Sequence, residues 1–347
     1  VSTFKIARAL DHQAFEEAFR SLVDAADALR STFVDLNGVP RCVIRALHRE
    51  PLVEQVNLTN EADPDAALRR WVSQRGRRRL PIDSRSFDTA LIRTKAEETV
   101  WYLNQHHLIA DAWSTRLVFD NVAAIYESIT ADGQPPKIIL PAFEAWVDAL
   151  DCVENVSARK SACEYWNSKA GEANSLERIS FFGSKQRVLD PEAERQTVEL
   201  GQNRANRLRQ LLGEPSLRAF SDDLALFQVF ATVLFALLYR ASGQSALTIG
   251  SPALNRATVA ERETIGLMME MLLLRVDVED SDTLATLHAK VRAETLDLLR
   301  HGRAGVSSAS LVRTFSVLLN FVSGSYSGFG GAPTDVDYMH TGVAEPH

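Results

Sequence analysis

Two adjacent histidines and an aspartate form the part of the sequence best suited to chemistry. His106 and His107 are followed, four residues after the second, by Asp111. Imidazole exchanges protons near neutral pH, so a histidine can act as a general base, and a nearby carboxylate can orient its ring. The spacing alone supports a structural histidine pair and a general base at His107 equally well. Nearby acidic and cysteine residues follow no known metal-ligand pattern, so we expect no metal site.

We expect this motif to lie where a strand gives way to a helix. Residues 99–104 are rich in β-branched and aromatic side chains, which is typical of a strand. Beyond residue 114, the apolar residues Val118, Val122 and Ile125 recur on one helical face. A histidine at such a junction can face a cavity instead of the core, so the functional interpretation begins at His107.

Strands interleaved with long helices recur in both halves of the chain. This order predicts an α/β fold of two lobes, divided near residues 170–185, with domains at 1–175 and 176–347. A long helix is expected over 142–170, between the halves. The strands expected in the second half are 196–200, 246–249, 271–278 and 316–322, and its helices are 205–212, 224–241 and 283–299.

The composition is that of a soluble globular protein, with 46% hydrophobic and 24% charged residues among 347. The net charge of −7 argues against nucleic acid as the main partner. The basic run 75–79 indicates a solvated face, or a docking site for an acidic protein. Residues 224–239 are apolar but short for a membrane span and interrupted by Gln228, so we expect a buried helix and no membrane contact. An odd number of scattered cysteines suits reduced thiols in the cytoplasm: Cys42, Cys152 and Cys163.

Residues 106–114, HHLIADAWS, resemble the HHxxxDG signature of condensation domains from nonribosomal peptide synthetases. Further motifs of that family follow in the expected order along nearly the whole chain. They resemble the family's LRTxF, YW, GxPxxxR, IGxFVNTLxxR and fN elements at residues 28–33, 165–166, 250–256, 265–275 and 318–321.

The resemblance implies two lobes, each like chloramphenicol acetyltransferase, in a V-shaped pseudo-dimer around a central tunnel. Phosphopantetheine arms of a donor and an acceptor carrier protein would enter this tunnel from opposite sides. The family joins a donor acyl or peptidyl thioester to the amine of an aminoacyl thioester, forming an amide. The implied partners are these carrier proteins and neighbouring synthetase domains, and the domain itself would bind no cofactor.

The resemblance also implies roles for single residues of the motif. His107 would accept a proton from the attacking amine or hold that amine by a hydrogen bond, while His106 is structural. Asp111 would pair with an arginine that braces the loop, and Arg85 and Arg93 are the candidates. Two further motif residues complete the set: Trp113 would pack, and Ser114 would cap the next helix or bond near the substrate.

Two departures from the family pattern bear on the site. Ala112 replaces the motif glycine, which narrows the site if that position needs a positive φ and is otherwise a tolerated methyl. Glu270 stands where the family has asparagine, so Met269 and Glu270 are candidates for the tunnel lining. There Glu270 would select an acceptor with a positive charge or a hydroxyl.

Three functions are alternatives to amide formation by a condensation domain. They are a catalytically silent recruiting member of the superfamily, an ester-forming domain and a CoA-dependent acyltransferase.

Overall fold

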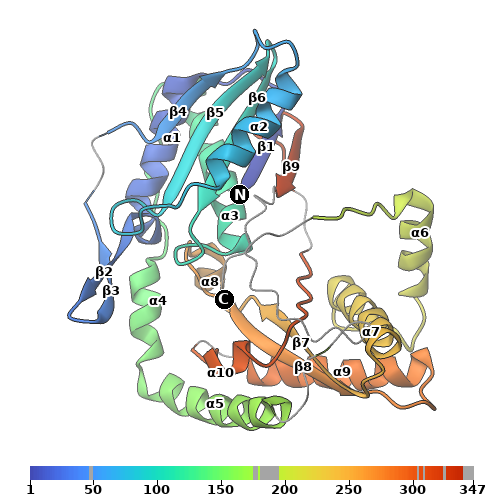
Figure 1. The fold of residues 1–347 in the computed structure, drawn as a ribbon. Coiled ribbons are helices and arrows are strands. Elements are labelled where there is room, and N and C mark those ends of the chain that lie inside the picture. The colour runs from blue at the N-terminus through green and yellow to red at the C-terminus, as the bar shows by residue number, and fades with distance from the viewer. Residues whose placement is uncertain are drawn as a thin grey trace.

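The computed structural model describes residues 1–46, 50–174, 179, 195–302, 305–307, 309–322 and 326–338. Two bodies of mixed α/β structure lie one above the other in Figure 1. We call them the N-terminal lobe, built on the sheet that contains β1, and the C-terminal lobe, built on β7 and β8. The predicted α/β class is confirmed.

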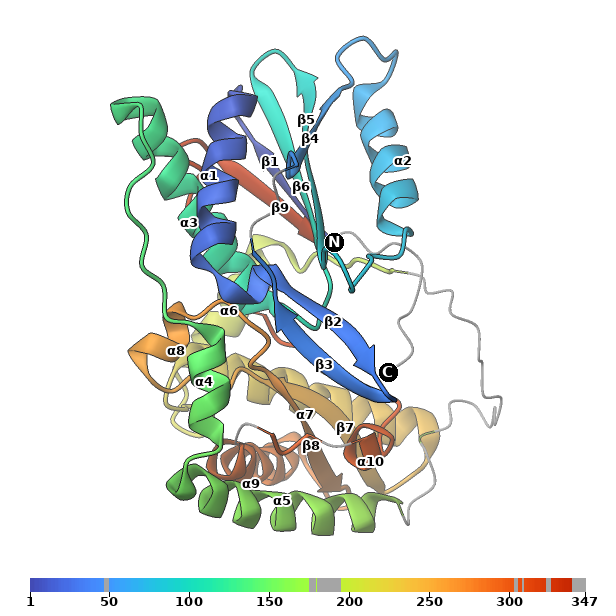
Figure 2. The same ribbon diagram turned by 90° about the vertical axis from the view of Figure 1, so that its left-hand side faces the viewer.

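The sheet of the N-terminal lobe has the strand order β4-β5-β6-β1-β9. Strand β6 is buried on both faces: Trp101 and Leu103 enter the core beneath α1 and α3, while Val100 and Tyr102 face the α2 side. Figure 2 shows α1 and α3 on one face of this sheet and α2 on the other. The elements are β1 (Ser2–Ile6), α1 (His12–Ala25), β4 (Val53–Asn57), α2 (Pro64–Gly76), β5 (Phe87–Lys95), β6 (Glu98–Gln105), α3 (Ala112–Asp132) and β9 (Thr334–Tyr338).

A hairpin and a helix extend from the N-terminal lobe toward the C-terminal lobe. A short 3-10 helix (Asp27–Arg30) leads into β2 (Ser31–Leu36) and β3 (Val39–Ile44). Their turn uses Asn37 and Gly38, whose φ angles of 58° and 81° favour these residue types. Helix α4 (Phe143–Leu150) then descends to α5 (Val153–Asn174), which lies along the base of the C-terminal lobe (Figure 2).

In the C-terminal lobe, an antiparallel pair of strands packs against long helices. Helices α7 and α9 lie side by side and, with α5, cover β7 and β8. The chain at 317–319 runs beside β7, since the amide of Gly250 bonds Val317 and that of Leu319 bonds Gly250. The elements are α6 (Gly201–Leu211), α7 (Asp222–Ser242), β7 (Ala246–Ala253), α8 (Val259–Glu263), β8 (Glu270–Asp277), α9 (Leu284–His301) and α10 (Ala309–Val312).

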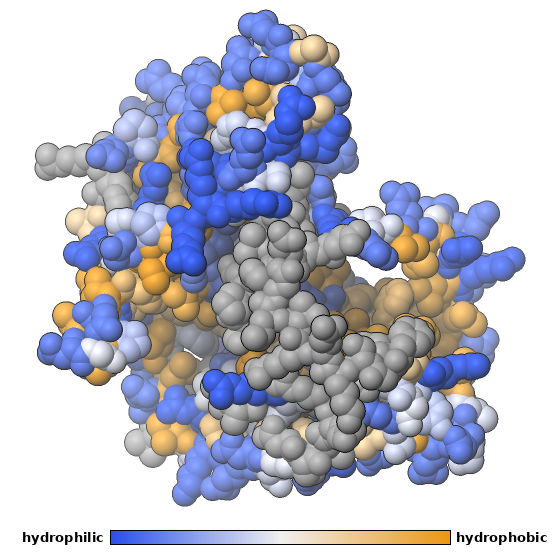
Figure 3. Space-filling view, viewed as in Figure 1, coloured by the Kyte–Doolittle hydropathy of each residue, from blue (hydrophilic) through white to orange (hydrophobic). Residues whose placement is uncertain are grey.

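Among the described residues, α7 is the one helix long and apolar enough to cross a membrane by length and composition. Its buried side chains, such as Phe235 and Leu238, belong to the core of the C-terminal lobe. Apolar side chains also gather in the hollow between α6 and α7, seen at the right of Figure 3. Core helices of folded proteins pass the same test, and the core contacts of α7 agree with the expected buried helix.

Three predicted elements differ from the structure. The strand expected over 196–200 is wrong: these residues are exposed and pair with no described strand. The helix expected over 142–170 is two helices, because the chain turns at residues 151–152 between α4 and α5. The strand expected over 316–322 forms only an isolated bridge between Leu318 and Gly250.

The last described segment returns from the C-terminal lobe to the N-terminal lobe. Strand β9 pairs antiparallel with β1, an element that the sequence did not predict. Just before β9, Phe329 is fully buried, with its ring centroid 5.6 Å from that of Phe119 and 5.9 Å from that of Phe15. Residues 326–338 therefore complete the N-terminal core. The domain division at 175/176 stays a prediction, and its boundary lies outside the described residues.

Candidate active site

The histidine motif forms a tight turn between β6 and α3. The amide of His106 donates to the carbonyl of Ser86 at 2.8 Å, and the amide of Ile109 donates to the carbonyl of His106 at 3.0 Å. Nδ1 of His106 accepts a hydrogen bond from the amide of Leu108 at 3.2 Å, which places the proton of the neutral ring on Nε2. The half-buried ring of His106 thus helps to shape the turn.

His107 occupies the exposed tip of this turn. Within the described part of the chain, no hydrogen bond to its imidazole is formed. Its backbone position is set by the bonds of the residues on either side. Neither ring nitrogen of His107 thus bonds another described residue, whereas Nδ1 of His106 takes part in the turn.

Asp111 fixes the start of α3 and is almost completely buried. It is the N-cap of that helix, and its Oδ1 accepts from the amide of Ser114 at 2.8 Å. Its Oδ2 accepts from the amide of Met268 at 3.1 Å, across the lobe boundary. Arg256 Nη2 lies 3.2 Å from Oδ1 and 3.1 Å from Oδ2. Both carboxylate oxygens are thus occupied, so Asp111 braces the motif rather than orienting His107.

The arginine that pairs with Asp111 is Arg256, and the candidates Arg85 and Arg93 are wrong. Arg85 instead lies over the ring of Phe87, with 5.6 Å from its guanidinium carbon to the centroid. The partner comes from the other lobe, 145 positions along the chain. Sequence proximity favoured the two nearer arginines and could not reveal this contact.

Arg256 gathers the loop between β7 and β8 around the motif. Its Nη1 donates at 2.6 Å to the carbonyls of Glu261 and Thr264. Its Nη2 also lies 2.9 Å from the carbonyl of Gly266, so the two hydrogens on this atom are shared among several acceptors. The Arg256 and Asp111 side chains are only 2% and 1% exposed. A buried pair this well supplied with hydrogen bonds holds its geometry firmly.

Ser114 joins the two lobes instead of capping the helix. Its hydroxyl donates to the carbonyl of Gly266 at 2.7 Å and accepts from the amide of the same residue at 3.0 Å. The expected cap role is therefore wrong, since Asp111 is the cap. A Cβ at Gly266 would lie 2.1 Å from Cδ2 of Phe143, so the close packing of this residue against Phe143 requires glycine.

The two residues between Asp111 and Ser114 have separate roles. Trp113 donates from Nε1 to the carbonyl of Arg262 at 2.8 Å, which adds another bond between the lobes. Ala112 is the exposed first residue of α3 and has helical backbone angles. A positive φ is not required there, so the methyl group is tolerated.

Asp27 has a role that the sequence did not reveal. Its Oδ1 accepts from the amide of Phe143 at 2.9 Å, and its Oδ2 accepts from the amide of Glu144 at 2.8 Å. Asp27 thereby supplies the N-terminal cap of α4, whose own N-cap residue, Ala142, offers no side-chain bond. An aspartate that caps a helix 116 positions away leaves no local sequence signal.

Among the described residues, no group of three or more histidine, cysteine, aspartate or glutamate side chains could hold a metal ion.

A family model for the condensation domain matches residues 1–311. The chain belongs to the condensation domain family. The predicted family is thereby confirmed, and it is a family of acyltransferase-type enzymes.

Relatives of this condensation domain are peptide synthetases. Malpinin synthetase of Mortierella alpina is 26% identical over 294 residues, which are 83% of this chain and 4% of that protein. Phosphinothricin tripeptide synthetase PhsC of Streptomyces viridochromogenes is 27% identical over 309 residues, 86% of this chain and 27% of that protein. The chain thus spans a small part of each relative's length.

Solved condensation domains share the fold. The starter condensation domain of rhizomide synthetase RzmA, solved as a mutant with C8-CoA, has a TM-score of 0.82 and 23% identity, covering 99% of this chain and 78% of that one. The first condensation domain of the CDA synthetase has a TM-score of 0.81 and 20% identity, covering 99% and 80%. These similarities confirm the predicted condensation-domain architecture. The tunnel between the lobes stays a prediction.

Of the two candidate lining residues of this condensation domain, Glu270 borders a cavity in the C-terminal lobe. Its Oε1 accepts from the amide of Gly305 at 2.5 Å and its Oε2 from the amide of Ser307 at 2.9 Å. Both oxygens therefore hold the 305–307 segment, and selection of an acceptor by Glu270 stays a prediction. Met269 is half-buried and does not line this cavity.

Proposed function

We propose that this condensation domain forms an amide bond between a donor acyl or peptidyl thioester and the amine of an acceptor aminoacyl thioester. The observation that carries the proposal is the contrast within the motif. His107 is exposed with its ring free of hydrogen bonds to the described residues, on a turn that the buried Asp111–Arg256 pair holds in place. A reactive group on a rigid support is what positional catalysis requires.

In the proposed reaction, the acceptor nitrogen attacks the donor carbonyl carbon and forms the new C–N bond. The C–S bond then breaks, and the donor carrier leaves as a thiol. His107 either takes the proton of the attacking nitrogen and passes it to the sulfur, or holds the amine in line by a hydrogen bond. A general base contributes roughly 10²–10⁴-fold to the rate. Positioning of two tethered reactants can contribute as much.

We further propose that both substrates arrive on carrier proteins through phosphopantetheine arms, with no cofactor bound by the domain itself. The synthetase names of the relatives support neighbouring domains as partners. The three cysteines are free thiols, and two of them, Cys42 and Cys152, are exposed. Such thiols stay reduced in the cytoplasm, where we place the domain.

The decisive experiment follows acyl transfer between purified carrier proteins by intact-protein mass spectrometry. We expect H107A to lose at least about 10²-fold in transfer rate, because proton transfer or amine placement is removed. The matched control is L108A, which changes an exposed residue of the same turn and should keep the wild-type rate. Equal rates for H107A and wild type would refute the assignment of His107.

Additional substrates separate the alternatives. A hydroxyacyl acceptor tests ester formation. An acyl-CoA donor tests the CoA-dependent reaction and is included because the rhizomide neighbour was solved with C8-CoA. Carrier binding without transfer from any donor would support the catalytically silent, recruiting function.

A further inference from the structure

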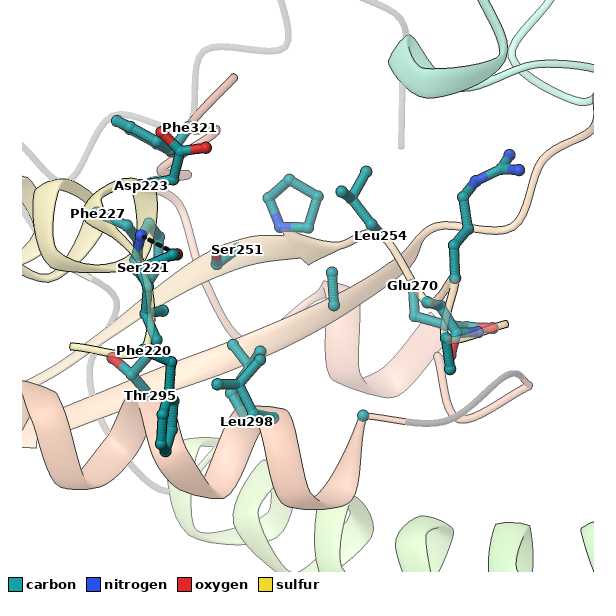
Figure 4. Close-up of a pocket in the computed structure, with 18 residues that line it drawn as sticks. Phe220, Ser221, Asp223, Phe227, Ser251, Leu254, Glu270, Thr295, Leu298 and Phe321 are labelled. Carbon is teal, nitrogen blue, oxygen red and sulfur yellow. Dashed lines mark hydrogen bonds between the residues drawn. The ribbon is translucent and has the colours of Figure 1, made fainter. Parts of the chain in front are cut away.

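A cavity of about 610 Å³ opens in the C-terminal lobe between α7, β7 and α9. Its volume lies within the roughly 300–1,000 Å³ typical of sites for small molecules. Figure 4 shows Phe220, Phe227 and Phe321 on one side of it, with Leu298 below and Leu254 toward the other end. We call it the α7–α9 pocket.

The wall of the α7–α9 pocket contains apolar side chains that the fold leaves uncovered. Phe220 is 86% exposed just before α7, Leu254 is 50% exposed after β7, and Leu299 is 52% exposed on α9. Each comes from a different part of the chain, yet all three border the same hollow. Phe227 and Phe321 add two rings packed edge to face, with centroids 6.3 Å apart. Apolar surface that converges on one hollow would gain from an apolar occupant.

Two of the charged groups at the other end of the pocket are already engaged within the protein. Both carboxylate oxygens of Glu270 accept hydrogen bonds from backbone amides. Arg256 directs Nη1 to two carbonyls and Nη2 to Asp111. Each of these two groups is therefore held by partners within the protein.

Arg256 connects the pocket with the motif, because it lines the pocket and also bonds Asp111, which ends the His107 turn. The next residue back, Asn255, also lines the pocket, and its φ of 55° is a left-handed conformation that asparagine adopts more readily than most residues. The pocket and the proposed reaction centre thus lie on either side of one buried ion pair.

We propose that the α7–α9 pocket binds the apolar carbon chain of one of the two thioester substrates. This inference rests on the proposed function, which supplies the thioesters. The chain would be an aliphatic acyl group on the donor or an apolar side chain on the acceptor. Both have the same chemistry, and the experiment below distinguishes them.

Binding is tested without catalysis by calorimetric titration of S-acyl pantetheines, from acetyl to dodecanoyl, into the H107A domain. We expect affinity to rise by about fourfold per buried methylene until the chain fills the pocket. A253F places a ring in the pocket, so it should abolish this gain for long chains and leave the acetyl compound unaffected. Affinity that is independent of chain length would overturn the proposal. Because every titration uses H107A, the binding of the acyl chain is tested independently of catalysis by His107.

A second pair of variants guards against misfolding of A253F. F220A removes a ring that is 86% exposed and contributes little to the core, so it should fold normally and weaken long-chain binding by several-fold. The matched control is L237A, an equally simple truncation of a 59%-exposed residue on α7 outside the pocket, which should bind as wild type. Equal binding by F220A and L237A would contradict the pocket assignment.

Transfer assays with wild-type domain then identify the substrate. In one arm the acyl chain on the donor carrier is lengthened, and in the other the side chain on the acceptor carrier is enlarged. The arm whose rate responds to chain length, and loses that response in F220A, identifies the occupant. No response in either arm would refute the proposal even if His107 proves essential.

Discussion

Nη2 of Arg256 lies 3.1 Å from Oδ2 of Asp111, and this contact joins the start of α3 in one lobe to the β7–β8 loop of the other. Both side chains are almost fully buried, and each makes further hydrogen bonds. Hydrogen bonds from Ser114 to Gly266 and from Trp113 to the carbonyl of Arg262 also join the two lobes near this pair. The position of His107 therefore depends on how the two lobes meet, although His107 itself belongs to one of them.

Removal of one member of this buried pair should be costly. We expect R256A to lose about 3–5 kcal/mol of unfolding free energy, because Asp111 would stay buried without its cation. Urea unfolding measures the loss, and the exposed pair of Arg300 with Asp297 supplies the control R300A, which should change stability little. Since both residues share one network, D111N and R256A together should lose less than the sum of the single variants. Additive losses would mean that the pair is not coupled.

Gly266 should resist even the smallest side chain. G266A places a methyl 2.1 Å from the ring of Phe143, so we expect a loss of about 1–3 kcal/mol. G171A is the control, since a methyl there meets nothing within 4 Å and a helix favours alanine over glycine. Thermal unfolding should place G171A at or above wild type and G266A below it. If F143A does not reduce the cost of G266A, the clash with Phe143 is not its cause.

Local patterns predicted the elements that surround the motif, because their signals are local. The apolar positions of α3 and the aromatic run of β6 repeat with the period of a helix and a strand. The structural role expected of His106 rests instead on the family resemblance. What the sequence lacked was any indication of which distant residues meet.

Three examples show this limit. The partner of Asp111 lies 145 positions away, and the helix capped by Asp27 lies 116 positions away. Strand β9 pairs with β1 across nearly the whole chain, and its short alternation of aspartate with Thr334, Val336 and Tyr338 does not indicate which strand it joins. Such contacts depend on tertiary packing, which a single sequence does not encode as a local period.

The returning segment before β9 should be essential to the N-terminal core. Phe329 is fully buried among the aromatic rings of Phe15, Phe119 and Tyr126. We expect F329A to cost about 3–5 kcal/mol of unfolding free energy, through lost burial and a cavity. Denaturant unfolding of F220A, whose ring is exposed, gives the control for loss of a phenylalanine. Equal stability of the two variants would show that residues 326–338 do not complete this core.

His288 should make the C-terminal lobe sensitive to mild acid. It is 5% exposed, its Nδ1 lies 3.2 Å from the hydroxyl of Thr232, and its Nε2 has no partner among the described residues. Burial lowers the pKa of His288 below its ordinary value of 6.5, and the positive charge of Arg292 lowers it further.

The sign of the effect follows from proton uptake. Below pH 6.5 His288 is protonated in the unfolded chain but still neutral in the folded chain. The free energy of unfolding therefore falls as the pH drops from 6.5 toward the folded-state pKa. The H288Q variant lacks the titrating imidazole, so its free energy of unfolding should depend less on pH over that range. Urea unfolding of both proteins at a series of pH values gives the comparison. Parallel pH profiles would show that His288 is not the group that titrates.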